Sequence, residues 1–361
     1  MRLGPNSVER LNRARADLRM GVPVVLAHGD RFALVIAAEV LGKARLGQLR
    51  ALGQPVLAIT ARRAETLKLA AYDGDLVRVL LPGDAGLDWV AAMADPADDL
   101  AMPMKGPFRV CREGPADLHR AAIALAKTAH LLPAALVQEI AGGHALAAAE
   151  GLSFVDLATA PDLEASISLH PVAAARVPMA AAEAGRLQIF RPDNGGEEHY
   201  AIEIGTPARD KPVLARLHSA CFTGDVLGSL KCDCGTQLDA ALQQMNGAGA
   251  GVLLYLNQEG RGIGLANKMR AYSLQDQGFD TVEANHRLGF EDDERDFRTG
   301  AEILKRMGFS AVRLLTNNPA KIAMMQATGI DVVERVPLAV GKTRQNAAYL
   351  ATKAAKSGHL L

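Results

Sequence analysis

The chain has 361 residues, and its 40 Lys and Arg balance its 40 Asp and Glu, so the formal net charge is zero. A balanced charge offers no basic surface for a nucleic-acid backbone and no polybasic anchor for a membrane. Because a single hydrophobic core stops growing at roughly 250 to 300 residues, the length predicts two domains.

The N-terminus, MRLGPN, lacks an apolar signal region, and no run approaches the roughly 18 apolar residues that cross a bilayer. We therefore expect a cytoplasmic protein with a small-molecule substrate and no nucleic-acid or membrane partner. In a reducing compartment, clustered cysteines are more typical of metal ligands or catalysts than of disulfides.

The first half indicates alternating helices and strands. Residues 7–21 have the apolar period of a helix, and the apolar runs 23–27 and 32–41 are typical of strands. The pattern weakens over 160–168 and a new one begins near Pro171. We predict an α+β protein with domains 1–168 and 169–361.

The second half opens with a hairpin signal. The alternating runs 185–190 and 198–205 are separated by the turn residues RPDNGGE. Two strand-loop-helix units follow, and the second should begin its helix with Asn318 as N-cap and Pro319 as first residue.

Three of the four cysteines, Cys221, Cys232 and Cys234, fall within fourteen positions. Three thiolates can converge on one zinc ion, and an open fourth position is the catalytic arrangement. His218 could instead complete a closed structural site, and the spacing alone favours that alternative. Cys111 stands apart, and we expect it to be a small core residue.

Two loops are candidates for binding phosphate. The glycine-rich 259–264 lies between a strand and a helix and contains Arg261, and 316–321 ends in Lys321. Alone, the first is an ordinary tight turn and the second an ordinary capped helix. Together with the cysteines, they favour a nucleotide substrate.

Four stretches in this order carry a specific resemblance: RLHSACFTGDVLGSLKCDCGTQLDAAL (216–242), LLYLNQEGRGIGLANKMRAYSLQDQGFDTVEAN (253–285), LGFEDDERDF (288–297) and RLLTNNPAK (313–321). They resemble GTP cyclohydrolase II, the entry enzyme of riboflavin biosynthesis, from about Pro171 to the C-terminus. The resemblance implies a mixed α/β domain that converts GTP to 2,5-diamino-6-ribosylamino-4(3H)-pyrimidinone 5′-phosphate, formate and pyrophosphate.

The resemblance also implies the site. Cys221, Cys232 and Cys234 hold a catalytic zinc ion, and Mg²⁺ accompanies the triphosphate. Asp293 is the proton acceptor and Tyr272 assists ring opening. Arg295 is the nucleophile toward the α-phosphate, although an electrostatic role is equally open because guanidinium stays protonated. The residues expected to contact GTP are Arg216, Leu217, His218, Ser219, Ala220, Gln237, Glu259, Gly260, Arg261, Thr281, Thr316 and Lys321.

One position departs from the family. Ala220 replaces the glutamate of the usual His-Ser-Glu-Cys segment, which removes a potential hydrogen-bond acceptor for the substrate. Two alternatives therefore stay open: a homologue with an altered substrate or a partial reaction, and a non-catalytic, zinc-stabilised nucleotide-binding protein. A zinc deaminase is disfavoured because its signatures are missing.

The first half resembles 3,4-dihydroxy-2-butanone 4-phosphate synthase in the runs 16–27, 35–41 and 122–140. That activity needs an acidic cluster for magnesium and an Arg-x-Gly-His-Thr-Glu stretch. Here only Asp30 and Glu39 stand where the acidic run belongs, and 112–117 lacks His-Thr-Glu. We expect a degenerate synthase-like α+β domain without that chemistry, which either serves dimerisation or steadies the C-terminal domain. We also expect a homodimer.

Overall fold

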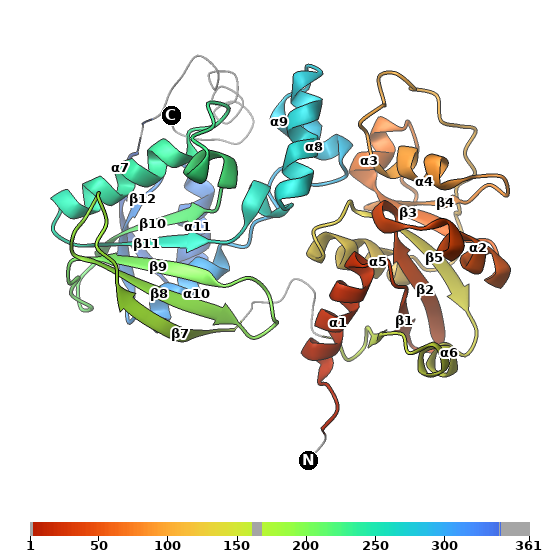
Figure 1. Ribbon diagram of the computed structural model, residues 1–361, viewed down its shortest axis with the longest axis horizontal. Coiled ribbons are helices and arrows are strands. Elements are labelled where there is room, and N and C mark those ends of the chain that lie inside the picture. Colours follow the sequence, from red (N-terminus) through yellow and green to blue (C-terminus); the bar gives the residue numbers. More distant parts are fainter. Residues whose placement is uncertain (1–2, 161–167, 339, 341–361) are drawn as a thin grey trace. The chain divides into compact units, whose positions relative to one another are not determined.

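The computed structural model describes residues 3–160, 168–338 and 340 (Figure 1). The chain divides into two compact units, the first comprising 1–165 with 266–293 and the second comprising 166–265 with 294–361. The stretch 161–167 beside the expected boundary, and the C-terminal 341–361, lie outside the described residues. The boundary at 168/169 stays a prediction.

The first unit is built on a six-stranded sheet in which only the β1–β6 pairing is parallel. In sheet order the strands are β4 (Leu76–Leu80), β3 (Val56–Thr60), β5 (Ala134–Ile140), β2 (Arg31–Ala37), β1 (Val24–His28) and β6 (Phe154–Asp156). The apolar run 23–27 is confirmed as β1, and the first part of 32–41 forms β2, with Val24 opposite Val35, whereas its end turns into the 3-10 helix at residues 38–40.

Helices α1 (Ser7–Arg19) and α5 (Asp117–Thr128) share one core with β1 and β2. A capping box between Asn6 and Glu9 begins α1, so the predicted helix is confirmed. The other helical elements of this unit are η1 (Ala38–Val40), α2 (Lys43–Leu52), α3 (Ala61–Thr66), α4 (Leu87–Ala94), α6 (Gly143–Glu150), α8 (Leu265–Asp276) and α9 (Thr281–Arg287). Cys111 is only half-buried, contrary to expectation, because it follows an isolated bridge at the edge of the sheet.

The second unit is built on a seven-stranded mixed sheet. In sheet order the strands are β13 (Asp331–Val336), β12 (Ala311–Leu315), β10 (Val213–Ser219), β11 (Gly251–Leu256), β9 (His199–Ile204), β8 (Gly185–Pro192) and β7 (Leu169–Arg176). Strands β10 to β13 are parallel, and β7, β8 and β9 form an antiparallel meander. The predicted hairpin is confirmed, with Gly185 opposite Ile204.

Helices cover both faces of this sheet (Figure 1). Helix α7 (Cys234–Gly247) packs on one face through Ala241 and Met245, and α10 (Arg298–Arg306) and α11 (Pro319–Ala327) pack on the other. Asn318 caps α11 and Pro319 is its first residue, as predicted. Within the described ranges, no helix is both long and apolar enough to span a bilayer.

Candidate active site

The order of the parallel strands creates a topological switch point at their carboxyl ends. From β10 the chain crosses through α7 to β11 on one side, whereas from β12 it crosses through α11 to β13 on the other. In open α/β sheets, ligands bind where neighbouring connections diverge in this way. The switch point lies between β10 and β12. Thr316 comes directly after β12, and Cys221 comes two residues after the end of β10.

The three clustered cysteines meet near the carboxyl end of β10. Cys221 follows β10, Cys232 lies in the next loop, and Cys234 is the first residue of α7. The Sγ atoms of Cys221 and Cys232 are 3.8 Å apart, and all three sulfurs lie within 4.8 Å of one another. Sulfurs held at about 2.3 Å by tetrahedral zinc would be about 3.8 Å apart. The donor set and its spacing therefore fit zinc.

Two glycines make this convergence possible. A Cβ on Gly224 would lie 2.8 Å from Sγ of Cys232 and 3.1 Å from Sγ of Cys221. A Cβ on Gly235 would lie 2.3 Å from the carbonyl oxygen of Gly224. The turn after β10 therefore has room for the sulfurs because both residues lack a side chain.

The electrostatics of the cluster favour a cation. Hydrogen bonding to Cys221 raises the pKa of Cys232, and it raises that of Cys234 well above its ordinary value, with hydrogen bonding to Cys232, burial and neighbouring negative charge adding to the effect. Three thiols this close resist ionising together because their charges repel. A bound cation offsets that repulsion, as thiolate ligands of zinc require.

His218 lies outside this group of ligands. Among the described residues, the only set of three or more potential metal ligands is the three cysteines. The Nε2 atom of His218 lies 3.1 Å from each carboxylate oxygen of Asp225 instead. The cluster therefore has three side-chain donors in this structure.

Arg216 is buried at the centre of the sheet, with 8% of its surface exposed. Its guanidinium donates to the carbonyl oxygen of Leu315 at 3.2 Å and to Oε1 of Gln237 at 2.5 Å, and Gln237 in turn donates to Asp233. Burial lowers the pKa of Arg216 to about 10, so it remains charged at neutral pH. Its buried Nε has no protein partner, which leaves one N–H for a ligand.

The glycine-rich loop η3 (Glu259–Gly262) is tied to both the cysteine turn and the segment after Asp293. Gly260 and Arg261 have φ values of 64° and 63°. The carboxylate of Glu259 accepts from the backbone N–H of Phe222 at 2.6 Å, and the carbonyl oxygen of Arg261 accepts from the N–H of Glu294 at 3.0 Å. The predicted loop thus borders the metal-fitting cluster.

Two cations gather on one aromatic ring. The guanidinium of Arg295 and Nζ of Lys321 each lie 4.7 Å from the ring centroid of Phe297. Arg295 also donates to Oγ of Ser219 at 3.3 Å, and Lys321 donates to the carbonyl oxygen of Leu217 at 2.9 Å. Both positive charges therefore stand at the carboxyl end of β10, where a phosphate can meet them.

Thr316 and Ala220 complete the second unit's share of the predicted site. Oγ1 of Thr316, a residue that is 3% exposed, accepts from the N–H of Asn318 at 3.0 Å and shapes the turn into α11. Ala220 donates its N–H to the carbonyl oxygen of Leu256 at 2.8 Å, and its methyl group provides no acceptor.

Three predicted residues belong to the first unit. Tyr272 lies on α8, where Nζ of Lys268 is 5.7 Å from its ring centroid, and Thr281 is the first residue of α9. Asp293 is exposed, and it is the last residue of 266–293, the second stretch of the chain that belongs to the first unit. Their relation to the cysteines stays a prediction.

Sequence reasoning missed Asp225, Tyr255 and Phe297, which hold the predicted residues in place. Asp225 follows Cys221 by four residues inside the conspicuous CFTGD stretch, and that was the available signal. Tyr255 is the one residue of the apolar strand GVLLYL with a polar group on its side chain, and its hydroxyl bonds to Asp225.

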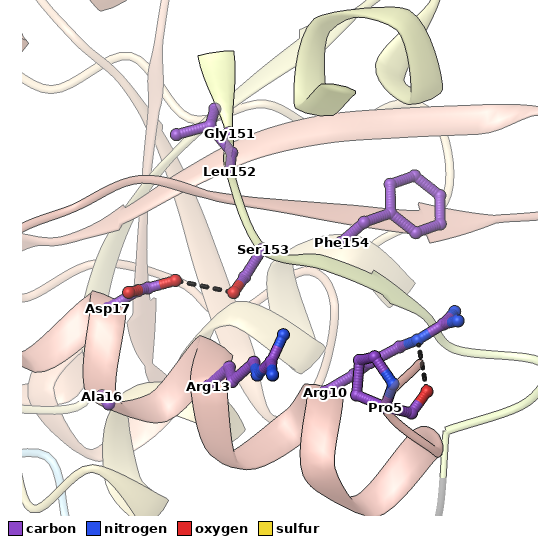
Figure 2. Close-up of a pocket in the computed structure, with 9 residues that line it drawn as sticks. All are labelled: Pro5, Arg10, Arg13, Ala16, Asp17, Gly151, Leu152, Ser153 and Phe154. Carbon is purple, nitrogen blue, oxygen red and sulfur yellow. Dashed lines mark hydrogen bonds between the residues drawn. The ribbon is translucent and has the colours of Figure 1, made fainter. Parts of the chain in front are cut away.

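A separate pocket opens in the first unit between α1 and residues 151–154, with a volume of about 420 Å³ (Figure 2). Oγ of Ser153 donates to Asp17 at 2.6 Å across its floor, and Nε of Arg10 donates to the carbonyl oxygen of Pro5. Arg10 and Arg13 are exposed, so the pocket is a surface hollow. None of the predicted site residues lines it.

Comparisons with known proteins agree on one family. The family model of GTP cyclohydrolase II matches residues 170–337. A GTP cyclohydrolase-2 from Azospirillum brasilense is 46% identical over 365 residues, which covers 98% of this chain and 94% of the relative. A GTP cyclohydrolase-2 from Cronobacter sakazakii is 60% identical over 166 residues, which covers 46% of this chain and 84% of the relative.

Solved structures also match the chain. One of them is a two-domain 3,4-dihydroxy-2-butanone 4-phosphate synthase from A. baumannii, with 16% identity and a TM-score of 0.32, covering 92% of this chain and 100% of that chain. At this TM-score the match carries no argument about the fold.

Proposed function

Because the chain belongs to the GTP cyclohydrolase II family of hydrolases, we propose that it opens the imidazole ring of GTP and releases formate and pyrophosphate as the first step of riboflavin biosynthesis. The product would be 2,5-diamino-6-ribosylamino-4(3H)-pyrimidinone 5′-phosphate. The observation that carries this proposal is the set of three cysteine sulfurs within 4.8 Å of one another at the β10–β12 switch point.

Cys221, Cys232 and Cys234 would hold zinc, because their sulfurs are spaced as zinc thiolates are and Gly224 leaves them room. When bound, zinc supplies Lewis-acid activation of water near neutral pH. The remaining work falls to the protein's own side chains. Asp293 would accept the proton, and Tyr272 would assist ring opening.

The triphosphate would meet the cations on Phe297. Arg295 and Lys321 are held there by contacts to Ser219 and Leu217, so their charges are in place before the substrate arrives. Mg²⁺ would enter with the triphosphate. We assign Arg295 an electrostatic role, since a protonated guanidinium resting on an aromatic ring is a poor nucleophile.

Ala220 supports a second candidate, a homologue that takes another purine nucleotide or stops before ring opening is complete. The residue leaves the binding segment without the carboxylate that the family usually has there. The carboxylate of neighbouring Glu259 already accepts from the N–H groups of Phe222 and Gly260. The homodimer and the cytoplasmic location stay predictions.

The test is an assay of formate and pyrophosphate with GTP, Zn²⁺ and Mg²⁺, with product mass. We expect the wild type to release both and Cys232→Ser to lose bound zinc and formate release. Cys111→Ser, which removes the cysteine outside the cluster, is the matched control and should behave as wild type. A product whose mass shows that the reaction stopped before formate was released would favour the second candidate. Zinc-loaded wild type that releases neither compound from GTP, nor from any other purine nucleoside triphosphate, would contradict both enzymatic candidates and leave a nucleotide-binding protein.

A further inference from the structure

One buried carboxylate, that of Asp225, joins the substrate segment to the cysteine turn. Its side chain is 4% exposed and accepts from three donors. These are Nε2 of His218, at 3.1 Å from each oxygen, the N–H of Cys221 at 3.0 Å, and the hydroxyl of Tyr255 at 2.9 Å. The donors come from β10, from the turn after it, and from β11.

The character of each donor follows from its surroundings. A backbone N–H can only donate, and burial together with the charge of Asp225 raises the pKa of Tyr255, so its hydroxyl keeps its proton. Burial lowers the pKa of His218, which leaves a neutral ring with one N–H. Because that ring faces a carboxylate through Nε2, the proton belongs on Nε2 and Nδ1 is bare.

The backbone of Cys221 is held on both sides by the same residue. The N–H of Asp225 donates to the carbonyl oxygen of Cys221 at 2.7 Å, and the carboxylate of Asp225 accepts from the N–H of Cys221. This reciprocal pair closes the turn that contains Gly224. The rings of His218 and Tyr255 stack at 5.4 Å between centroids, opposite one another in the β10–β11 register.

We propose that Asp225 is a positioning residue with two separable effects: it sets the tautomer of His218, and it orients the backbone that presents the sulfur of Cys221. The importance of both effects for turnover rests on the proposed function. Groups that orient metal ligands and binding residues in this way typically contribute about 10- to 100-fold in metal affinity or activity. Each effect can be measured without turnover.

Asp225→Asn tests the first effect in the full-length protein. Its remaining oxygen can accept from Cys221 and Tyr255, whereas its NH₂ group now faces Nε2 of His218. In spectra of protein with ¹⁵N-labelled histidine, assigned with His218→Gln, we expect the proton to move from Nε2 to Nδ1. Zinc retention should stay as in wild type, and KM for GTP should rise by about tenfold with a smaller change in kcat.

Asp225→Ala tests the second effect, because it removes every acceptor. After dialysis against a chelator, we expect it to retain much less zinc than either wild type or Asp225→Asn. Asp210→Asn, which neutralises an exposed carboxylate in the same unit, is the control and should match wild type throughout. Circular dichroism checks that each variant is folded, and if Asp225→Ala is not, the near-isosteric Asp225→Leu, which also lacks an acceptor, takes its place.

A wild-type tautomer and KM in Asp225→Asn would overturn the proposal, and so would wild-type zinc retention in folded Asp225→Ala. If the wild-type protein released no formate from GTP, the proposed function would fail. The histidine spectra and the zinc content would still decide the role of Asp225.

Discussion

Gly224 lies among the three cysteine sulfurs, and its missing side chain is a requirement of the site. A Cβ there would lie 2.8 Å from Sγ of Cys232 and 2.9 Å from Cβ of Cys234. Neither neighbour can retreat far, because Cys232 is buried in the turn before α7 and Cys234 is the first residue of that helix. We expect Gly224→Ala to spread the sulfurs and to lower bound zinc per chain, measured by atomic emission.

The matched control is Gly247→Ala at the end of α7, where an added Cβ meets nothing within 4 Å. We expect it to keep its zinc and to be neutral or slightly stabilising, since alanine favours helices. Full zinc occupancy in Gly224→Ala would show that the turn can relax around the added methyl group.

His119, on α5 of the first unit, predicts a pH dependence. The residue is 3% exposed and neither ring nitrogen has a hydrogen-bond partner. Burial, followed by the charge of Arg78, lowers its pKa to about 4 from 6.5. As the pH falls from 6.5 towards 4, His119 of the unfolded chain binds a proton, whereas His119 of the folded chain does not. The free energy of unfolding should therefore fall by roughly 2 kcal/mol between pH 7 and pH 5 from this group.

We expect His119→Leu to remove that part of the pH dependence and to be more stable than wild type at pH 5. Urea unfolding followed by the fluorescence of Trp89, the single tryptophan and a residue of the same unit, measures it. The control is His144→Gln, which replaces an exposed imidazole. An equal loss of stability between the two pH values in wild type and His119→Leu would refute the assignment.

At the level of elements, local signals were sufficient where one short stretch decides the structure. The turn residues between 190 and 198 predicted the β8–β9 hairpin, and Asn318 with Pro319 predicted the start of α11. The cysteine spacing likewise predicted a metal-fitting cluster. These features depend on neighbours in sequence, so a single chain reveals them.

Features that depend on distant partners could not be predicted. Residues 265–278 have the pattern of a helix, but nothing in it shows which core the helix joins. In the structure Asn267 of α8 donates to the carbonyl oxygen of His130, and Arg270 pairs with Glu39. Asp225 was missed for the same reason, because its partners His218 and Tyr255 come from two separate strands.

Asn318 links the start of α11 to the site. Its side chain accepts from the N–H of Ala320 at 2.9 Å, and Lys321 lies in the turn that this bond fixes. We expect Asn318→Ala to cost about 1 kcal/mol of stability. It should also raise KM for GTP several-fold, because the turn that carries Lys321 frays. Asn318→Ser, which keeps an acceptor, should recover most of both effects in thermal denaturation and kinetics. An unchanged stability and an unchanged KM for GTP in Asn318→Ala would show that the cap does not position Lys321.

At the scale of the whole molecule, the relative from Azospirillum brasilense matches both halves, so the N-terminal half is part of the family resemblance. In the N-terminal half of this chain, the carboxylates of Glu39 and Asp117 are already paired, which speaks against magnesium binding there. One oxygen of Glu39 accepts from the N–H of Leu132 and the other pairs with Arg270, and Asp117 is occupied by His28 and Arg31. In the described parts of this half, no three acidic or histidine groups converge.

We therefore expect the full-length protein to convert no ribulose 5-phosphate in the presence of Mg²⁺. A carboxylate already paired with a guanidinium must break that pair before it can bind the cation, and magnesium needs carboxylates that are free to do so. The measurement is formate release from ribulose 5-phosphate, with GTP in a parallel reaction as the control for active protein. Formate from the sugar phosphate above the enzyme-free background would show that the N-terminal half retains synthase chemistry through another set of residues. If GTP yields formate and ribulose 5-phosphate does not, the formate-releasing chemistry belongs to the site beside the three cysteines.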